Sequence, residues 1–510
     1  MAASSPAFRR AGKAGLRWLY FGHRWLGVVA CLFFAMWFFS GVVMMYVPYP
    51  ALTGEERLAR SPPIAWARVA VDPGRALTTA GATRYPDQLR LEMMGPTPVY
   101  RIRGGGRDAV ISAVDGRRIG PVSEAQAAAS AAAFAPGSRP VLRELLARDQ
   151  WTVADGFDRA RPMYLFDMND GRGGRLYVSR ATGEVVQDTD ARERFWNWVG
   201  SMPHWLYPTA LRQNQPAWRQ VVMWISGVAT ISAVTGIWIG ILRLRIRKTR
   251  PEQRHSPYRG WMMVHHWAGL VGGLFLTTWI VSGWWSVNPF RWFDTPSLSS
   301  EGLALYAGQS APRFEADLSR LAAVGPGATQ AAFVWLQGKP RVVLAYPGGG
   351  EVLLDARTGA RARLTDPAIF AAAGHLLPGA RVMGTLRQTQ DDNYWYSHHD
   401  TRPMPVLRAA YDDPARTWIY ISPASGQVLD ISNASSRAYR WVFAGLHQLD
   451  FRFLVLHRPA WDLALWLLAA GGSVTSVSGL VIGWRTLRGR RKRLPGSNAA
   501  CLASTAESFM

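Results

Sequence analysis

The chain has 510 residues, of which 48% are hydrophobic, and it carries a formal net charge of +23. A basic excess of this size suggests nucleic acid or a membrane surface as the partner. Its two cysteines, Cys31 and Cys501, lie in an apolar stretch and in a polar tail. Two thiols are too few for a thiolate zinc or iron–sulfur site, and no disulfide is expected between them.

Four runs without a charged residue are long enough to cross a membrane, since about 20 apolar residues span a hydrocarbon core of roughly 30 Å. They cover residues 25–47, 221–242, 267–290 and 463–484. The first run ends in Val47-Pro48-Tyr49 and has no small-residue cleavage site. We therefore interpret it as a membrane helix and not as a secretory signal.

Basic residues cluster before the first run, between the second and third runs, and after the fourth. They are Arg9, Arg10, Lys13, Arg17 and Arg24; Arg243, Arg245, Arg247, Lys248, Arg250, Arg254 and Arg259; and Arg485, Arg488, Arg490, Arg491, Lys492 and Arg493. All three clusters fall on one side of the membrane, which the positive-inside rule makes cytoplasmic. The charge thus reflects topology in a lipid bilayer, and no nucleic-acid partner is expected.

This topology divides the chain into nine segments. They are a cytoplasmic N-terminus (1–20), membrane helices at 21–47, 217–242, 261–290 and 460–484, outer domains at 48–216 and 291–459, a basic cytoplasmic loop (243–260) and a basic cytoplasmic tail (485–510). The predicted fold class is therefore a membrane α-helical protein with four transmembrane helices and two outer domains.

The two outer segments have the composition of soluble domains. Short alternating runs at 175–179 and 417–421 precede turns at Gly183 and Gly426, and runs at 99–102 and 342–345 lead toward Gly116 and Gly359. These patterns predict strand–turn–strand units. A helical pattern at 123–133 flanks one of them, so we expect small α+β domains.

The two halves of the chain repeat each other, each as helix, outer domain, helix. A shift of 243 residues aligns Arg194, Trp198, His204 and Gly236 with Arg437, Trp441, His447 and Gly479. A shift of 242 aligns His23, Ser40 and Gly41 with His265, Ser282 and Gly283. Two tandem two-helix repeats of equal topology predict a pseudo-two-fold axis along the membrane normal.

Two histidine positions recur in both halves, which gives two pairs of equivalent residues. His23 and His265 lie at the cytoplasmic ends of the first and third helices, and His204 and His447 lie near the outer surface. Histidine is the usual nitrogen ligand of haem iron, and ionisable residues at membrane depth are usually functional. A two-fold axis would bring each pair face to face across one iron. The alternative is that these histidines cap helix ends or lie at the lipid interface.

The chain resembles the PepSY-associated transmembrane family. Residues 23–27 (His-Arg-Trp-Leu-Gly) open an apolar helix that ends in Ser40-Gly41, as that family begins. The strand–Thr-Gly–strand elements, followed in each half by an arginine and a histidine, resemble its PepSY units. The resemblance implies a bacterial inner-membrane protein with cytoplasmic termini, two periplasmic PepSY-like domains and b-type haem, two per chain. It also implies electron transfer to a periplasmic ferric siderophore or other ferric chelate.

By matching positions, His23, His265, His204 and His447 inherit the expectation of haem ligation. His266 is an alternative to its neighbour His265, because only one of two adjacent residues would face inward.

Three further histidines have no counterpart in the other half. His398 and His399 follow a segment rich in aromatic and acidic residues, where they would contact a ferric substrate or a metal, or lie in a solvated loop. His457 abuts the fourth helix and is a second-choice ligand for the outer haem.

The expected function is thus a transmembrane haem-dependent ferric-siderophore reductase. No GxGxxG follows a strand in the short cytoplasmic segments, so electrons would come from a reductase, a reduced flavin or quinol. Two alternatives remain. One is a non-enzymatic membrane protein whose PepSY domains bind peptides or regulate a protease or sensor. The other is a small-solute or metal transporter.

Overall fold

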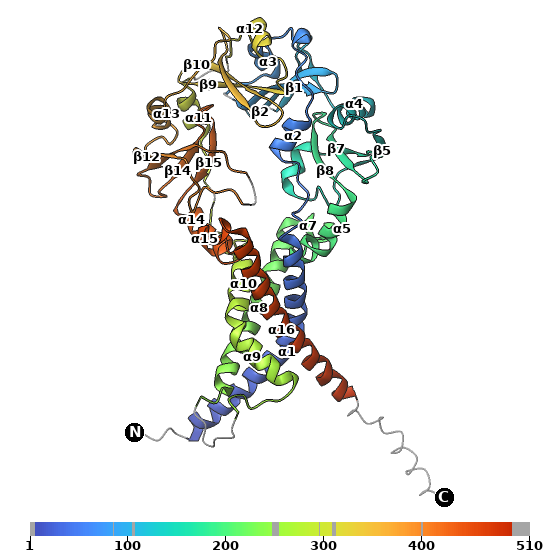
Figure 1. The fold of residues 1–510 in the computed structure, drawn as a ribbon, viewed down its shortest axis with the longest axis vertical. Coiled ribbons are helices and arrows are strands. Elements are labelled where there is room, and N and C mark those ends of the chain that lie inside the picture. The colour runs from blue at the N-terminus through green and yellow to red at the C-terminus, as the bar shows by residue number, and fades with distance from the viewer. Residues whose placement is uncertain are drawn as a thin grey trace, which may run out of the picture.

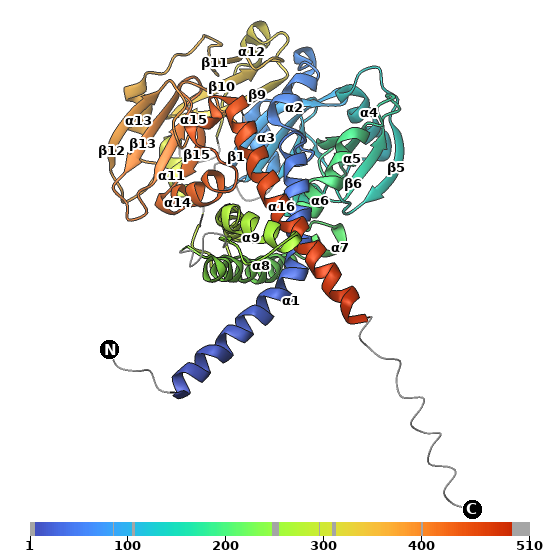
Figure 2. The same cartoon turned by 60° about the horizontal axis from the view of Figure 1, so that its bottom comes forward.

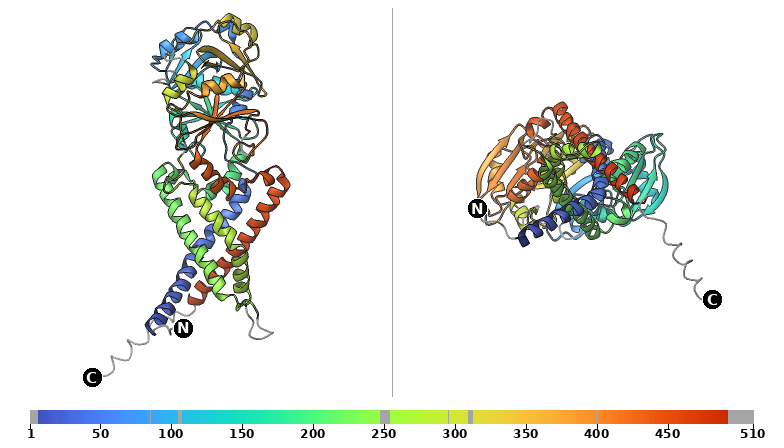
Figure 3. Two further views of the ribbon diagram at one scale, coloured as in Figure 1. Left: turned by 90° about the vertical axis from the view of Figure 1, so that its left-hand side faces the viewer. Right: turned by 90° about the horizontal axis from the view of Figure 1, so that it is seen from below.

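The computed structural model describes residues 6–84, 86–104, 108–246, 254–294, 296–308, 313–398 and 401–491. They form a helical bundle and an assembly of β-sheets, which are stacked along the long axis of the molecule (Figures 1 and 3). We call the end of the bundle that meets the sheets the sheet end, and the opposite end the terminal end. His399 and Cys501 lie outside the described residues.

The bundle consists of long apolar helices. Its helices are α1 (Pro6–Met44), α8 (Gln215–Arg243), α9 (Trp261–Val271), α10 (Gly273–Trp285) and α16 (Arg458–Arg491). Among the described residues, α1, α8 and α16 are each long and apolar enough to cross a membrane. Because α1 packs against both α8 and α16, Phe34 and Phe38 of α1 lie in a shared buried core. The chain is therefore a membrane protein.

The segment expected as one straight helix at 261–290 is bent. α9 and α10 meet at an angle of 61°, with Gly272 between them. A Cβ at Gly272 would lie 2.9 Å from the Ala268 carbonyl oxygen and 3.5 Å from that of Gly471 in α16. Glycine therefore permits a close approach of the two backbones at the bend. A fourth crossing exists if this pair forms a single span.

In the part of the chain that the structure describes, all strands pair antiparallel, in three sheets. The central sheet has the order β11 (Glu351–Asp355), β10 (Lys339–Ala345), β9 (Gln330–Leu336), β1 (Pro86–Met94), β2 (Thr97–Gly104), β3 (Ala109–Ser112) and β4 (Arg118–Ile119). One flanking sheet contains β5 (Val141–Leu146), β6 (Met163–Asp167), β7 (Arg175–Ser179) and β8 (Val185–Thr189). The other contains β12 (Val382–Gln388), β13 (Val406–Tyr411), β14 (Trp418–Ile421) and β15 (Val428–Ser432). The flanking sheets lie on opposite sides of the central one (Figures 1 and 2).

The central sheet joins the two segments that the sequence suggested as separate outer domains. β1 pairs with β9, placing Arg90 opposite Ala332 and Glu92 opposite Gln330. A core of Leu91, Tyr100 and other buried residues continues across this junction. The sheets therefore form one assembly, with strands from both segments in its middle layer.

Short helices cover the sheets. They are α2 (Gly54–Arg60), η1 (Trp66–Arg68), α3 (Pro73–Ala80), α4 (Glu124–Phe134), η2 (Asp155–Ala160), α11 (Ser300–Ala307), α12 (Leu318–Val324) and α13 (Asp366–Ala373). The predicted helix at 123–133 is confirmed as α4, with Ser123 as its N-cap. The turns at Gly116, Gly183, Gly359 and Gly426 are confirmed too, since all four residues have positive φ.

A second set of short helices connects the flanking sheets to the bundle. They are α5 (Ala191–Val199), α6 (Ser201–His204), α7 (Thr209–Arg212), α14 (Ala434–Arg440), the π-helix η3 (Trp441–Gly445) and α15 (Arg452–Val455). One face of the β5–β8 sheet packs against α4. Its other face packs against Met202 and Tyr207, so that this sheet holds the segment that contains His204.

Candidate functional site

Two histidines face each other at the sheet end of the bundle. His204 ends α6, and His447 follows η3 closely. Their ring centres are 6.1 Å apart and their planes are inclined by 65°. These two residues come from opposite halves of the chain, one from each repeat.

Matched hydrogen bonds orient these two rings. Nδ1 of His204 lies 3.1 Å from the Ser40 hydroxyl, and Nδ1 of His447 lies 3.1 Å from the Ser282 hydroxyl. Ser40 donates its own proton to the Met36 carbonyl oxygen, so it accepts from His204. Nδ1 of His447 also lies 3.2 Å from the Trp279 carbonyl oxygen. A carbonyl can only accept, so the proton of His447 is on Nδ1.

Glycines let both rings lie against the helices. A Cβ at Gly41 would be 3.1 Å from Cε1 of His204, and a Cβ at Gly283 would be 3.2 Å from Cε1 of His447. Both contacts are tighter than ordinary van der Waals packing. The Ser-Gly pairs at 40–41 and 282–283 are thus the complementary surface for the two imidazoles.

The histidines toward the terminal end are held by the same kind of contact. Nδ1 of His23 lies 3.2 Å from the Ser232 carbonyl oxygen in α8. Nδ1 of His265 lies 3.0 Å from the Thr475 carbonyl oxygen in α16. Gly236 and Gly479 provide the room, because a Cβ there would lie 2.7 Å from Cε1 of His23 and 3.1 Å from Cε1 of His265.

All four rings therefore leave Nε2 without a hydrogen bond to the described residues. Within the described residues, the hydrogen bonds of these rings involve Nδ1 alone. A metal-binding histidine has this arrangement, with Nδ1–H donated to a protein oxygen and Nε2 left for the metal.

The separation of the ring centres at the sheet end is close to that of two imidazoles on one metal ion. Two metal–imidazole bonds of roughly 2.0–2.1 Å, with about 1.2 Å from each nitrogen to its ring centre, separate the centres by about 6.4 Å. The observed separation is 6.1 Å. No group of three or more His, Cys, Asp or Glu side chains suited to a metal occurs in the described part of the chain. A haem needs only two ligands from the protein, and His204 and His447 are the residues that would hold it here.

His266 has a different environment from its neighbour. Its Nδ1 lies 2.8 Å from the Ser256 hydroxyl, and its Nε2 lies 2.9 Å from the Gly240 carbonyl oxygen. Both nitrogens are engaged in linking the segment before α9 to the end of α8. Of the two adjacent histidines, His265 therefore has the geometry of a ligand.

The remaining candidate histidines, His398 and His457, form hydrogen bonds with groups other than those that hold these four rings. Nδ1 of His398 contacts the buried carboxylate of Asp450 at 3.0 Å, which also accepts a bond of 2.8 Å from Tyr396. Burial and this carboxylate raise the pKa of the Tyr396 hydroxyl, so it stays a donor. His457 is exposed and bonds to the Phe453 carbonyl oxygen one turn before it.

Matched tryptophans hold the two ligand segments against the membrane helices. Nε1 of Trp218 donates to the Trp205 carbonyl oxygen at 3.0 Å, and Nε1 of Trp461 donates to that of Gln448 at 2.9 Å. Each bond reaches the residue directly after a candidate ligand. The indole thereby fixes the position of the ligand backbone.

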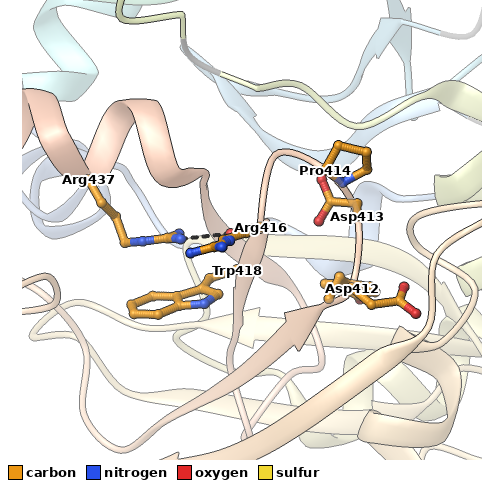
Figure 4. A pocket seen from close by; sticks show the side chains of 7 residues that line it. Asp412, Asp413, Pro414, Arg416, Trp418 and Arg437 are labelled. Atoms are coloured by element: carbon orange, nitrogen blue, oxygen red, sulfur yellow. Dashed lines mark hydrogen bonds between the residues drawn. The ribbon is translucent and has the colours of Figure 1, made fainter.

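The two repeated arginines connect the flanking sheets to their helices. Arg194 donates to the Gly173 carbonyl oxygen at 2.8 Å, and Arg437 donates to that of Arg416 at 2.7 Å. Figure 4 shows Arg437 above the Trp418 ring, where its guanidinium carbon is 3.9 Å from the ring centre. Arg437 and Trp418 line an open hollow of ≈ 670 Å³. Arg194 and Arg437 therefore each hold a connecting helix against its flanking sheet.

The model of the PepSY-associated TM region matches residues 22–339, which is more than half of the chain. The chain belongs to the PepSY-associated transmembrane family. The match extends from the residue before His23 into β10, and so includes His204 and His265. His447 lies beyond it. A comparison with curated proteins finds no match.

Sequence reasoning located the four histidines but not most of the groups that hold them. Ser40, Ser282 and the four glycines carried a signal, because each recurs at the offset between the halves. The carbonyl oxygens of Ser232, Thr475 and Trp279 carried none, since every residue has a carbonyl. Asp450 and Tyr396 carried none either, because residues of other types stand 243 positions earlier.

Proposed function

We propose that this PepSY-associated transmembrane protein is a haem-containing reductase that passes electrons across a bacterial inner membrane to a ferric chelate. The observation that carries the proposal is the shared geometry of His23, His265, His204 and His447. Each has a fixed Nδ1–H and a free Nε2, and one pair is at the spacing of two axial ligands.

The proposed topology follows from charge. The basic clusters flank the terminal end of the bundle, which the positive-inside rule makes cytoplasmic. The chain would then cross the membrane four times as two tandem two-helix repeats, with the bent pair α9 and α10 as the third span. The termini would be cytoplasmic, and the sheets would form the periplasmic part, with PepSY-like character.

We propose two haem sites, one near each face of the membrane. His23 and His265 would hold the haem near the cytoplasm, and His204 and His447 the haem near the periplasm. A b-type haem with two axial histidines supplies reversible one-electron transfer without an open coordination position. The buried serines and the helix carbonyls keep the rings in a fixed orientation.

The substrate would be a ferric siderophore or another ferric chelate at the periplasmic side. Each Fe(III) would take up one electron and become Fe(II), which hard oxygen donors bind more weakly. The electron would come from a cytoplasmic reductase, from reduced flavin or from quinol. The iron would be released from its chelator by this reduction.

Absorption spectra test the haem proposal. The detergent-purified protein should bind about two haems per chain and give the sharp α-band of low-spin b-type haem on reduction with dithionite. His447→Ala and His265→Ala should each remove about half of this haem. His457→Ala and His266→Ala are the matched controls, and both should retain two haems. A protein that stays colourless after expression with ample haem would leave a peptide-binding or regulatory membrane protein.

Sealed vesicles test the direction of transfer. Protein reconstituted with a ferric chelate inside should reduce it when dithionite is added outside only. Vesicles containing His204→Ala should lose most of this reduction and serve as the control for leakage. Reduction only when donor and acceptor share one compartment would refute transfer across the membrane.

A further inference from the structure

Arg440 lies close in sequence to the proposed ligand at the sheet end. It is the last residue of α14 and the N-cap of η3, seven residues before His447. A π-helix of this kind widens the helical turn and is frequent at functional sites. The guanidinium carbon of Arg440 lies 4.3 Å from the centre of the Trp441 ring and 5.1 Å from that of Tyr396.

Arg440 has donors that the described residues leave unused. Its Nη2 donates to the Asp450 carbonyl oxygen. Its Nε and Nη1 are shielded from solvent, and neither forms a hydrogen bond with the described residues. Nη1 lies 3.8 Å from the position of a Cβ on Gly445, two residues before His447. Buried donors of a charged group are costly to leave unpaired, so this guanidinium calls for an anion.

The other half of the chain has no such cation. Asn197 stands 243 residues earlier, and its amide group is fully engaged. It donates to the carbonyl oxygens of Pro48 and Glu193 and accepts from Ser201. The unused donors of Arg440 are therefore not required to hold this type of segment together.

We propose that Arg440 binds a propionate carboxylate of the haem held by His204 and His447. The inference rests on the proposed function, because it needs a haem at that pair. A b-type haem has two propionates, and a guanidinium donates strong charge-assisted hydrogen bonds to carboxylate oxygens. Trp441 and Tyr396 pack against the guanidinium and hold it in place, so that Nε and Nη1 remain two separate donors.

Titration of the full-length, haem-free protein with haem b and with haem b dimethyl ester tests the proposal, because the ester has no propionate charge. At one of its two sites, wild-type protein should bind the dimethyl ester roughly tenfold more weakly than haem b, a difference in binding free energy of about 1.4 kcal/mol. Arg440→Met should abolish this difference, and Arg440→Lys should restore part of it. Arg452→Met removes an exposed cation in the same segment and should behave as wild type.

The outcomes separate this inference from the proposed function. The haem of His23 and His265 is an internal reference for folding, because Arg440→Met should not alter its affinity. If Arg440→Met keeps the preference for free haem, Arg440 does not bind a propionate. A variant that keeps the preference for free haem and has a higher KM for the ferric chelate would also refute the proposal. The guanidinium would then bind the substrate. Wild type that binds neither haem refutes the proposed function itself.

Discussion

At the scale of single residues, each candidate ligand pairs a histidine with a glycine on a neighbouring helix. Gly236 faces His23, Gly479 faces His265, Gly41 faces His204 and Gly283 faces His447. The glycines are required by close approach, since none of these four has a positive φ. The rings are thereby held by backbone surfaces, which vary less in position than flexible side chains do.

Gly236→Ala tests this packing. The new methyl group would lie 2.7 Å from Cε1 of His23, so ring or helix must shift. We expect a loss of about 1–3 kcal/mol in stability and a lower haem content, measured by thermal unfolding and absorption. Gly269→Ala is the matched control, because a Cβ at that glycine of α9 meets nothing within 4 Å. Equal behaviour of both variants would contradict the packing argument.

At the scale of elements, a buried ion cluster joins the central sheet to its neighbours. Glu92 of β1 is 5% exposed and accepts from Arg101 and, at 3.0 Å, from Arg57. Arg57 also donates to Gln330 of β9 at 3.0 Å, and Arg101 donates to the Thr182 carbonyl oxygen at 2.7 Å. One carboxylate thus connects strands of the central sheet to α2 and to the β7–β8 turn.

Removing that carboxylate should destabilise the sheets. Glu92→Gln would leave Arg101 buried without its anion and would remove the carboxylate partner of Arg57, and we expect a loss of about 3–5 kcal/mol. Chemical unfolding monitored by circular dichroism measures it. Glu315→Gln is the control, because its pair with Arg357 is exposed and should contribute less than about 1 kcal/mol. Similar losses in both variants would contradict the assigned role of Glu92.

The same carboxylate predicts a dependence on pH. Burial alone would raise the pKa of Glu92, but Arg101, Arg90 and Arg57 outweigh it and lower the pKa to about 2. A carboxylate with a lowered pKa stabilises the folded state above its unfolded value and loses that contribution as the pH falls. Stability should therefore decline between about pH 4.5 and 2. Glu92→Gln should flatten this decline. A variant whose stability depends on pH as that of wild type does would argue against the role of Glu92.

At the scale of the whole molecule, the two halves of the chain depend on each other. β1 and β9 share one sheet, α1 packs against α16, and Arg219 of α8 donates to the carbonyl oxygens of Val287 and Asn288 beyond α10. The ring of His204 faces that of His447. A candidate site at the sheet end therefore requires both halves.

Splitting the chain between residues 250 and 251 tests this dependence. The two pieces should co-purify when they are expressed together, because sheet and bundle interfaces remain, and they should bind haem as the intact chain does. Each piece alone should be degraded or aggregate, since it would expose one edge of β1 or β9 and a face of the bundle. The measurement is affinity purification through a tag on one piece. Two stable, separately folded pieces would contradict it.

The sequence by itself determined the membrane character, the places of the strands with their glycine turns, and the two histidine positions repeated in both halves. Charge-free runs, period-two alternation and residues repeated at a fixed offset are local or self-comparing signals. They need no knowledge of which surfaces meet. The helix at α4 and the turns at Gly183 and Gly426 follow from capping and from positive φ, which depend on neighbours in sequence.

Only the tertiary structure decided the bend at Gly272, the joining of both outer segments by β1 and β9, and the different hydrogen-bond partners of His265 and His266. The bend depends on how closely α16 approaches, and strand pairing across 240 residues leaves no mark in either strand alone. The two adjacent histidines have the same intrinsic chemistry. What distinguishes them is that the Gly240 carbonyl oxygen occupies Nε2 of His266, a partner brought close by packing of α8 on α9.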